Sequence, residues 1–103
     1  MVITIFKHRV RPGVGKEYAQ AALPLLAIAQ KMPGFVSVKN YAAQDGELLT
    51  LVEFESEQAL AAWRNHPQHL EAQKRGRNEF YVEYTIQVCK TLRAYDFKAP
   101  TAG

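Results

Sequence analysis

The sequence predicts an α+β domain whose elements follow the ferredoxin-like order β-α-β-β-α-β. Four runs rich in β-branched and aromatic residues are separated by Gly, Pro and Asp signals, a pattern typical of strands. Two stretches with apolar residues at helical spacing alternate with these runs. A chain in this order forms a four-stranded antiparallel sheet with both helices on one face.

The first half of the chain predicts a strand, a helix and a hairpin. Residues 2–10 are rich in Val, Ile and Phe and indicate the first strand. Residues 14–32 carry an apolar stripe at helical spacing, within which Pro24 is expected to kink the helix or divide it in two. Residues 35–43 and 48–54 flank an Asp-Gly turn signal, so they are expected to pair as a hairpin.

The second half predicts a capped helix, a second helical stretch and a long strand. Ser56 is expected to cap the first of these helices. Pro67 suits the first position of another helical stretch that runs to about Arg75, and Gly76 is expected to end it. Residues 79–92 are rich in Tyr, Val, Ile and Thr and predict the last strand.

The last strand carries apolar side chains that a half-exposed sheet would not need. One side is expected to present Phe80, Val82, Tyr84, Ile86 and Val88, and Tyr81 is expected to lead the other. Because a sheet with one face in water alternates apolar with polar residues, we expect the open face to pack against a second sheet. We therefore predict a homodimer through the sheet face and the last strand, with Tyr95, Asp96 and Phe97 contacting the partner.

Composition limits the class of protein. The chain has 103 residues, of which 48% are apolar, and is expected to form one domain over 1–97 with a flexible tail over 98–103. The net charge of +3 is spread along the sequence, so we expect no nucleic-acid partner. The single cysteine, Cys89, excludes an intrachain disulfide. No apolar run approaches the ~20 residues of a membrane helix, and we expect a cytoplasmic protein without a membrane partner.

The stretch from Phe54 to Phe97 resembles the antibiotic biosynthesis monooxygenase domain family, a branch of the dimeric α/β-barrel superfamily. The motifs that carry the resemblance are Trp63-x-x-His66-Pro67-x-His69, Ala72-Gln73 before Gly76, the long closing strand and Pro33-Gly34-Phe35. The resemblance covers nearly the whole chain. The block from Trp63 to Gly76 is specific for the family and says little about the substrate.

The resemblance implies two ferredoxin-like subunits whose sheets form a barrel, with a cavity in each subunit between sheet and helices. Some members oxidise phenolic or quinol-type molecules with O2 and use no flavin, haem or metal. Other members of the superfamily degrade haem, isomerise lactones or have no assigned activity. Gln73 stands where haem-degrading relatives carry a haem-ligating His, and their polar residue late in the first strand corresponds to His8. We therefore do not expect haem degradation.

Oxygenation without a cofactor needs a base, because the deprotonated substrate is the reductant, and it needs a dry pocket. His66 and His69 flank Pro67 and are the candidate catalytic bases, with Asn65 to orient a substrate oxygen. The alternative is that the two histidines and Asn65 cap the helix ends around Pro67. A metal site would need a third ligand such as His8 or Glu53, and no local spacing indicates one.

Six further residues are candidates for the walls of a substrate pocket. They are Trp63, His8, Phe35, Tyr41, Tyr81 and Tyr84. For each, ordinary packing in the core or in a dimer interface is the alternative. No Gly-x-Gly-x-x-Gly, Walker loop, cysteine pair or Gly-x-Ser-x-Gly is present, so we expect no nucleotide cofactor, no metal and no serine nucleophile.

Together these observations favour a homodimeric, cofactor-independent monooxygenase that oxidises an electron-rich phenolic or quinol-type molecule with O2. One alternative is a non-catalytic protein that binds a small ligand or acts in a stress response. Another is an isomerase or lyase that works by proton transfer alone with the same histidines.

Overall fold

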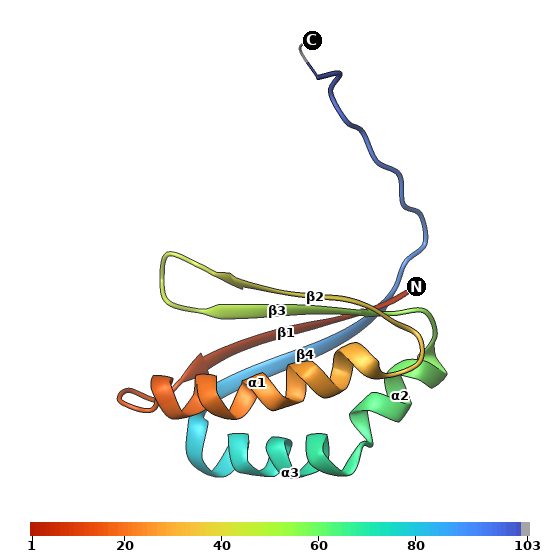
Figure 1. The fold of residues 1–103 in the computed structure, drawn as a ribbon. Coiled ribbons are helices and arrows are strands. Elements are labelled where there is room, and N and C mark those ends of the chain that lie inside the picture. Colours follow the sequence, from red (N-terminus) through yellow and green to blue (C-terminus); the bar gives the residue numbers. More distant parts are fainter. Residues whose placement is uncertain (102–103) are drawn as a thin grey trace.

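The computed structural model describes residues 1–101 and has the element order that the sequence predicts. The elements are β1 (Val2–Val10), α1 (Gly15–Lys31), β2 (Phe35–Ala42), β3 (Leu48–Phe54), α2 (Glu57–Arg64), α3 (Pro67–Arg75), η1 (Gly76–Phe80) and β4 (Tyr81–Lys90). The four strands form one antiparallel sheet in the order β2-β3-β1-β4, with the helices on one side of it (Figure 1). The predicted ferredoxin-like α+β fold is therefore confirmed.

The helices begin where the sequence signals place them. The Ser56 hydroxyl accepts a hydrogen bond from the Ala59 amide at 3.1 Å and caps α2. Pro67 occupies the first turn of α3, where its missing amide hydrogen has no helical partner to lose. α1 runs without a break through Pro24, so the division of this helix does not occur. Pro24 is exposed, and the carbonyl that it leaves unpaired can be hydrated.

The join between α3 and β4 differs from the prediction. Gly76 keeps a right-handed helical backbone (φ −57°), and the chain continues through the short π-helix η1 instead of ending there. The strand then begins at Tyr81 rather than at residue 79. A shift in the β1–β4 register between Arg9 and Val10 makes Val82 an extra residue in β4.

This irregularity changes which side chains share a face of β4. The expected placement of Tyr81 opposite Tyr84 is wrong, because the rings of the two residues lie 5.5 Å apart on the helix side. Tyr84 pairs directly with His8, which contacts α1, and this pairing places Tyr84 on that same side. An extra residue in a strand reverses the alternation of the side chains that precede it.

The core lies between the sheet and the helices α1 and α2. Its buried residues are Val2, Ala29, Phe54, Leu60 and Trp63. Further along the helix side, Tyr84, Ile86 and Val88 of the edge strand β4 are 37%, 55% and 50% exposed. An apolar row therefore lies uncovered on the side of the sheet that carries the helices.

The face of the sheet away from the helices is partly apolar. Ile3, Ile5, Leu49 and Leu51 lie there on the two central strands and are half-buried by their neighbours. The chain after β4 leads away from the sheet (Figure 1), and its Leu92, Tyr95 and Phe97 are 95%, 84% and 86% exposed. Of the tail expected over 98–103, residues 98–101 form no helix or strand, and 102–103 lie outside the described residues. None of the helices in residues 1–101 has the length and apolarity to cross a membrane.

Candidate functional site

A buried histidine and two tyrosines form a continuous hydrogen-bond chain beneath the end of β1. His8 is only 3% exposed. Its Nδ1 lies 3.3 Å from the Phe6 carbonyl oxygen, and its Nε2 lies 3.1 Å from the Tyr18 hydroxyl of α1. The Tyr18 hydroxyl in turn lies 3.2 Å from the Tyr81 hydroxyl of β4. We call His8, Tyr18 and Tyr81 the His8 chain.

The chemistry of these groups fixes the direction of the hydrogen bonds. A carbonyl oxygen can only accept, so Nδ1 of His8 carries the hydrogen and donates it to Phe6. Nε2 is then the acceptor for the Tyr18 hydroxyl, whose oxygen is left to accept from Tyr81. The structure thus points the hydroxyl hydrogens from Tyr81 through Tyr18 to His8 Nε2.

Burial keeps all three members of the His8 chain uncharged near neutral pH. It lowers the pKa of His8, and this effect outweighs the Phe6 carbonyl and the Glu47 carboxylate, which favour the cation. Burial also raises the pKa of Tyr18 and that of Tyr81, and the hydrogen bond that Tyr81 donates to Tyr18 raises the pKa of Tyr81 further. An unprotonated Nε2 at the end of two neutral hydroxyls can accept a proton without first losing one.

Aromatic rings enclose the His8 chain and hold it in place. The Phe6 ring stacks on His8 with centroids 4.3 Å apart and an angle of 17° between the planes. The Tyr81 ring meets both of these rings edge-on at 5.5 Å. Tyr84 packs against Phe6 and Tyr81 and is the most exposed ring of the group.

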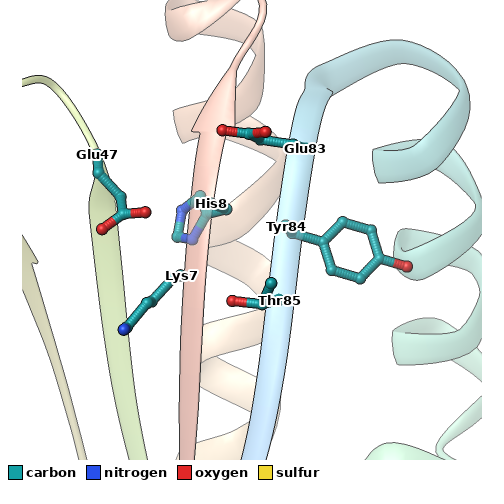
Figure 2. A pocket seen from close by; sticks show the side chains of 6 residues that line it. All are labelled: Lys7, His8, Glu47, Glu83, Tyr84 and Thr85. Atoms are coloured by element: carbon teal, nitrogen blue, oxygen red, sulfur yellow. The ribbon is translucent and has the colours of Figure 1, made fainter.

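A hollow of about 200 Å³ lies over this end of the sheet. The residues that line it are Lys7, His8, Glu47, Glu83, Tyr84 and Thr85 (Figure 2). Figure 2 shows Glu47 reaching it from the start of β3, with Glu83 and Thr85 on β4 and Lys7 on β1. The hollow is therefore lined mainly by polar and charged side chains.

The side chains predicted as catalytic lie at a second place, the corner between α2 and α3. Nδ1 of His66 accepts a hydrogen bond from the Gln68 amide at 3.2 Å and caps α3. The His69 ring stacks on Trp63 at 4.2 Å, and its Nδ1 donates to the Trp63 carbonyl at 3.2 Å. Asn65 ends α2 and is exposed. Burial lowers the pKa of His69 and outweighs the opposing effect of the Trp63 carbonyl.

Hydrogen bonding assigns different roles to the two imidazoles at this corner. In a neutral His66, Nδ1 accepts, so the hydrogen sits on Nε2 and is available for donation. In His69, Nδ1 donates, so Nε2 is the unprotonated nitrogen. The side-chain amide of Gln73 donates a hydrogen bond to the Arg64 carbonyl at 3.2 Å and joins α3 to α2.

The two remaining predicted pocket residues take no part in the hydrogen bonds of either group. Phe35 packs edge-on against Phe54 in the core at 5.8 Å. Tyr41 lies on the open face of the sheet beside Lys39, whose ammonium is 5.6 Å from the ring. The structure thus brings His8, Tyr81 and Tyr84 together. It gathers a second group, the α2–α3 corner, which consists of Trp63, Asn65, His66 and His69.

Sequence reasoning missed Tyr18, the middle member of the His8 chain. In the sequence, Tyr18 is only one member of the apolar stripe over residues 14–32. Its signal is weak, since a tyrosine on such a stripe most often packs its ring and leaves its hydroxyl in water. Only the contact between α1 and the end of β1 reveals its partners, His8 and Tyr81.

A cavity of about 300 Å³ lies between α2 and β4. Its lining residues are Glu57, Leu60, Ala61, Arg64 and Val88. Val88 begins the exposed row of β4 that continues through Ile86 to Tyr84, and at ~3.4 Å per residue this row is about 14 Å long. The row connects the cavity at α2 with the Tyr84 ring, which packs against Tyr81 of the His8 chain.

The described residues do not assemble a metal site. Among residues 1–101, no three His, Cys, Asp or Glu side chains come together in a way that could hold a metal ion. The third ligand considered for His66 and His69, namely His8 or Glu53, is therefore not supplied.

Three comparisons place the chain among known proteins. The uncharacterized protein YqjZ of Bacillus subtilis is 31% identical over 84 residues, which are 82% of this chain and 74% of that protein. The structure of Rv0793 from Mycobacterium tuberculosis superposes with a TM-score of 0.81 at 20% identity and covers 92% of this chain and 98% of that one. SnoaB from Streptomyces nogalater, described as a cofactor-independent oxygenase, superposes with a TM-score of 0.77 at 15% identity and covers 90% of this chain and 94% of that one.

The sequence itself identifies the family. Residues 1–75 match the family described as antibiotic biosynthesis monooxygenase. The matched segment contains His8, Tyr18 and the whole α2–α3 corner, and it ends just before η1. This chain belongs to the antibiotic biosynthesis monooxygenase family.

Proposed function

We propose that this protein is a cofactor-independent monooxygenase that oxidises an electron-rich phenol or quinol-type molecule with O2. Membership of the family supports a monooxygenase-like role. The observation that carries the proposal is the His8 chain, which joins two neutral hydroxyls to an unprotonated, buried imidazole nitrogen. This arrangement suits a reaction whose first step removes a phenolic proton.

The His8 chain can take up the phenolic proton of the substrate. A substrate phenol donates to the Tyr81 oxygen, while the Tyr81 hydrogen moves to Tyr18 and the Tyr18 hydrogen moves to His8 Nε2. The net result is a phenolate and an imidazolium, although neither tyrosine becomes charged. The phenolate gives up an electron to O2 more readily than the phenol does, so the protein supplies proton transfer and the substrate supplies the electrons.

The overall reaction balances as phenol plus O2 giving para-quinone plus water. The phenolate passes one electron to O2, and the phenoxyl radical and superoxide combine to form a C–O bond at the para carbon. The peroxide anion then takes back the proton that His8 holds. Loss of the ring proton with cleavage of the O–O bond releases water and leaves the quinone.

The exposed row on β4 supports an aromatic substrate. Ile86 and Val88 offer apolar side chains beside the cavity at α2, and Tyr84 offers a ring next to Tyr81. A flat molecule lying on this row would remove the three side chains from water, each CH2-sized portion of buried surface contributing about 0.8 kcal/mol. Its phenolic end would lie at the His8 chain.

The α2–α3 corner is the second proposal for the base. There His69 would accept the proton at Nε2, His66 would donate from Nε2, and Asn65 would orient a substrate oxygen. The stacking of His69 on Trp63 supports a fixed orientation for this imidazole. The two proposals differ in which histidine is essential.

Oxygen uptake by the purified protein with a panel of phenols and quinols tests the function. We expect His8→Gln to lower kcat by about 10²- to 10⁴-fold, the usual contribution of a general base. His69→Gln is the matched variant, and we expect it to retain most of kcat. A large loss in His69→Gln alone would place the base at the corner. Turnover without O2 would favour an isomerase or lyase, and binding without turnover would favour a ligand-binding protein.

We also propose that the working unit is a homodimer formed through the open sheet face and the segment after β4. The half-buried Ile3, Ile5, Leu49 and Leu51 support the first contact. The exposed Leu92, Tyr95 and Phe97 support the second, because three large apolar side chains in water are costly unless a partner covers them. Sedimentation equilibrium tests this: Leu49→Glu/Leu51→Glu should yield monomers, and a monomeric parent protein would refute it.

A further inference from the structure

We propose that Arg11 and Gly76 are positioning residues that hold the Tyr81 hydroxyl in place at the His8 chain. The inference rests on the proposed function and adds residues to it that lie outside the hydrogen-bond chain itself. Two contacts carry it: the close approach of the Tyr81 ring to Gly76, and the hydrogen bonds from Arg11 to the backbone of η1 and Tyr81.

Gly76 is a glycine because of space and not because of its backbone conformation. Its φ of −57° is open to any residue. A β-carbon at this position would overlap Cε2 of Tyr81 and lie 2.9 Å from Cδ2 of the same ring. Gly76 is buried, so the ring rests directly on its backbone. Any larger residue here must move the Tyr81 ring or the π-helix.

The π-helix η1 delivers Tyr81 to this spot and needs an external partner for its carbonyls. The last carbonyls of a helix have no N–H donor within the helix, so they need hydrogen-bond donors from elsewhere. The Arg11 backbone amide donates to the Phe80 carbonyl at 2.7 Å. The Arg11 side chain donates to the carbonyls of Asn78 at 3.0 Å and Tyr81 at 3.2 Å, and reaches that of Arg77 at 3.4 Å.

These contacts fix Tyr81 from three directions. Its amide donates to the Gly76 carbonyl, its own carbonyl accepts from Arg11, and its ring rests on Gly76. With the backbone and ring held, the hydroxyl is placed 3.2 Å from that of Tyr18. A displacement of about 1 Å at a reacting group can cost about 10²-fold in rate. Arg11 would therefore influence catalysis without touching a substrate.

The guanidinium group suits this task better than another cation would. Arginine presents several N–H groups in a fixed planar fork, whereas lysine offers a compact charge on a flexible stem. The carbonyls of Arg77, Asn78 and Tyr81 point at different nitrogens of the fork. We therefore expect Arg11→Lys to behave like Arg11→Gln, since charge alone does not replace the fork.

The test combines kinetics with a measurement that needs no turnover. The protein is labelled with 3-fluorotyrosine, and its five tyrosine signals are assigned by single Tyr→Phe changes. In Arg11→Gln and Arg11→Lys we expect shifted or broadened ¹⁹F signals for Tyr81 and Tyr18, with Tyr41 unchanged. We expect kcat to fall by about 10- to 100-fold while KM stays within about 2-fold.

Arg9→Gln is the matched control. Arg9 lies near the end of β1, two residues before Arg11, and its side chain forms ion pairs with Asp45 at 2.9 Å and Glu83 at 3.2 Å, neither of which belongs to η1. We expect this variant to keep the Tyr81 signal and kcat. Gly76→Ala should shift the Tyr81 signal as Arg11→Gln does, and the arginine variants carry the test if this variant does not fold.

Each outcome separates the positioning role from the proposed reaction. An unchanged Tyr81 signal in folded Arg11→Gln would overturn the inference, whether or not any substrate is found. A moved Tyr81 signal with unchanged kcat in an active enzyme would also overturn it. A moved signal in a protein that oxidises none of the phenols would support the positioning of Tyr81 and count against the monooxygenase proposal alone.

Discussion

Removing the hydroxyl of Tyr18 is the sharpest single test of the His8 chain. Tyr18→Phe keeps the ring, which packs edge-on against Phe80 at 5.5 Å and against Tyr81 at 5.6 Å. It deletes only the oxygen that accepts from Tyr81 and the hydrogen that is donated to His8. The change therefore interrupts the proton path and disturbs little else.

The structure gives the expected size of the loss in stability. Nε2 of His8 is buried and loses its donor, and an unsatisfied buried polar group costs about 1–3 kcal/mol. In a domain of about 100 residues each kcal/mol shifts Tm by about 4–8 °C, so we expect the Tm of Tyr18→Phe to fall by roughly 5–20 °C. The effect on rate should be larger than the effect on stability, because the whole proton path is cut at its centre. We expect kcat to fall by about 10²- to 10⁴-fold.

The assay measures kcat by oxygen uptake and the free energy of unfolding by urea denaturation on the same samples. Tyr95→Phe is the control, since it removes a hydroxyl outside the His8 chain and keeps the ring on which the proposed dimer contact depends. We expect Tyr95→Phe to match the parent protein in both measurements. A folded Tyr18→Phe protein with a kcat within about 2-fold of the parent would refute the proton path.

Two further predictions follow from the same geometry. Burial lowers the pKa of His8 and His69 in the folded state, so the unfolded state binds protons more readily. The free energy of unfolding should therefore be constant above about pH 7. It should fall as the pH drops below the ordinary histidine pKa of about 6.5. Urea denaturation between pH 5 and 8 checks this, and a flat profile, or the same slope in a His8→Gln/His69→Gln protein, would contradict it. Val88→Asp should raise KM for an aromatic substrate by about 10-fold, since a charge would then stand on the exposed apolar row; an unchanged KM would show that the substrate lies elsewhere.

The regular elements could be predicted because their signals are local. Ser56 and Pro67 mark helix starts through hydrogen bonds that lie within a few residues, and an Asp-Gly pair marks the hairpin. The hairpin pairs β2 with β3. The pairings of β1 with β3 and β4 follow from the β-α-β-β-α-β order, in which the helices carry the chain to a strand that is not the neighbour of the one before. The bounds predicted for the strands over residues 2–10 and 48–54 agree with the structure.

The site could be predicted only in part because its hydrogen bonds join distant segments. The sequence indicates His8 and Tyr81 as separate pocket candidates, and no local pattern connects either of them with Tyr18. The histidines around Pro67 attract notice in the sequence because they are close together. The structure shows that such closeness also serves capping and stacking, as it does for His66 and His69.

Three departures from the predicted structure lie close together at the join between α3 and β4. The π-helix η1, the extra residue Val82 in β4 and the close approach of Gly76 to Tyr81 all lie within seven residues of one another. In a regular strand Tyr81 and Tyr84 would lie on opposite faces, and the Tyr81 hydroxyl could not reach Tyr18. π-helical turns interrupt the regular hydrogen bonding of a helix and are frequent at functional sites, and β-bulges are over-represented next to active sites. The irregular backbone from Gly76 to Val82 is thus the segment that places Tyr81 in the His8 chain. This coincidence favours the His8 chain as the functional site over the α2–α3 corner, where the helices begin and end with ordinary caps.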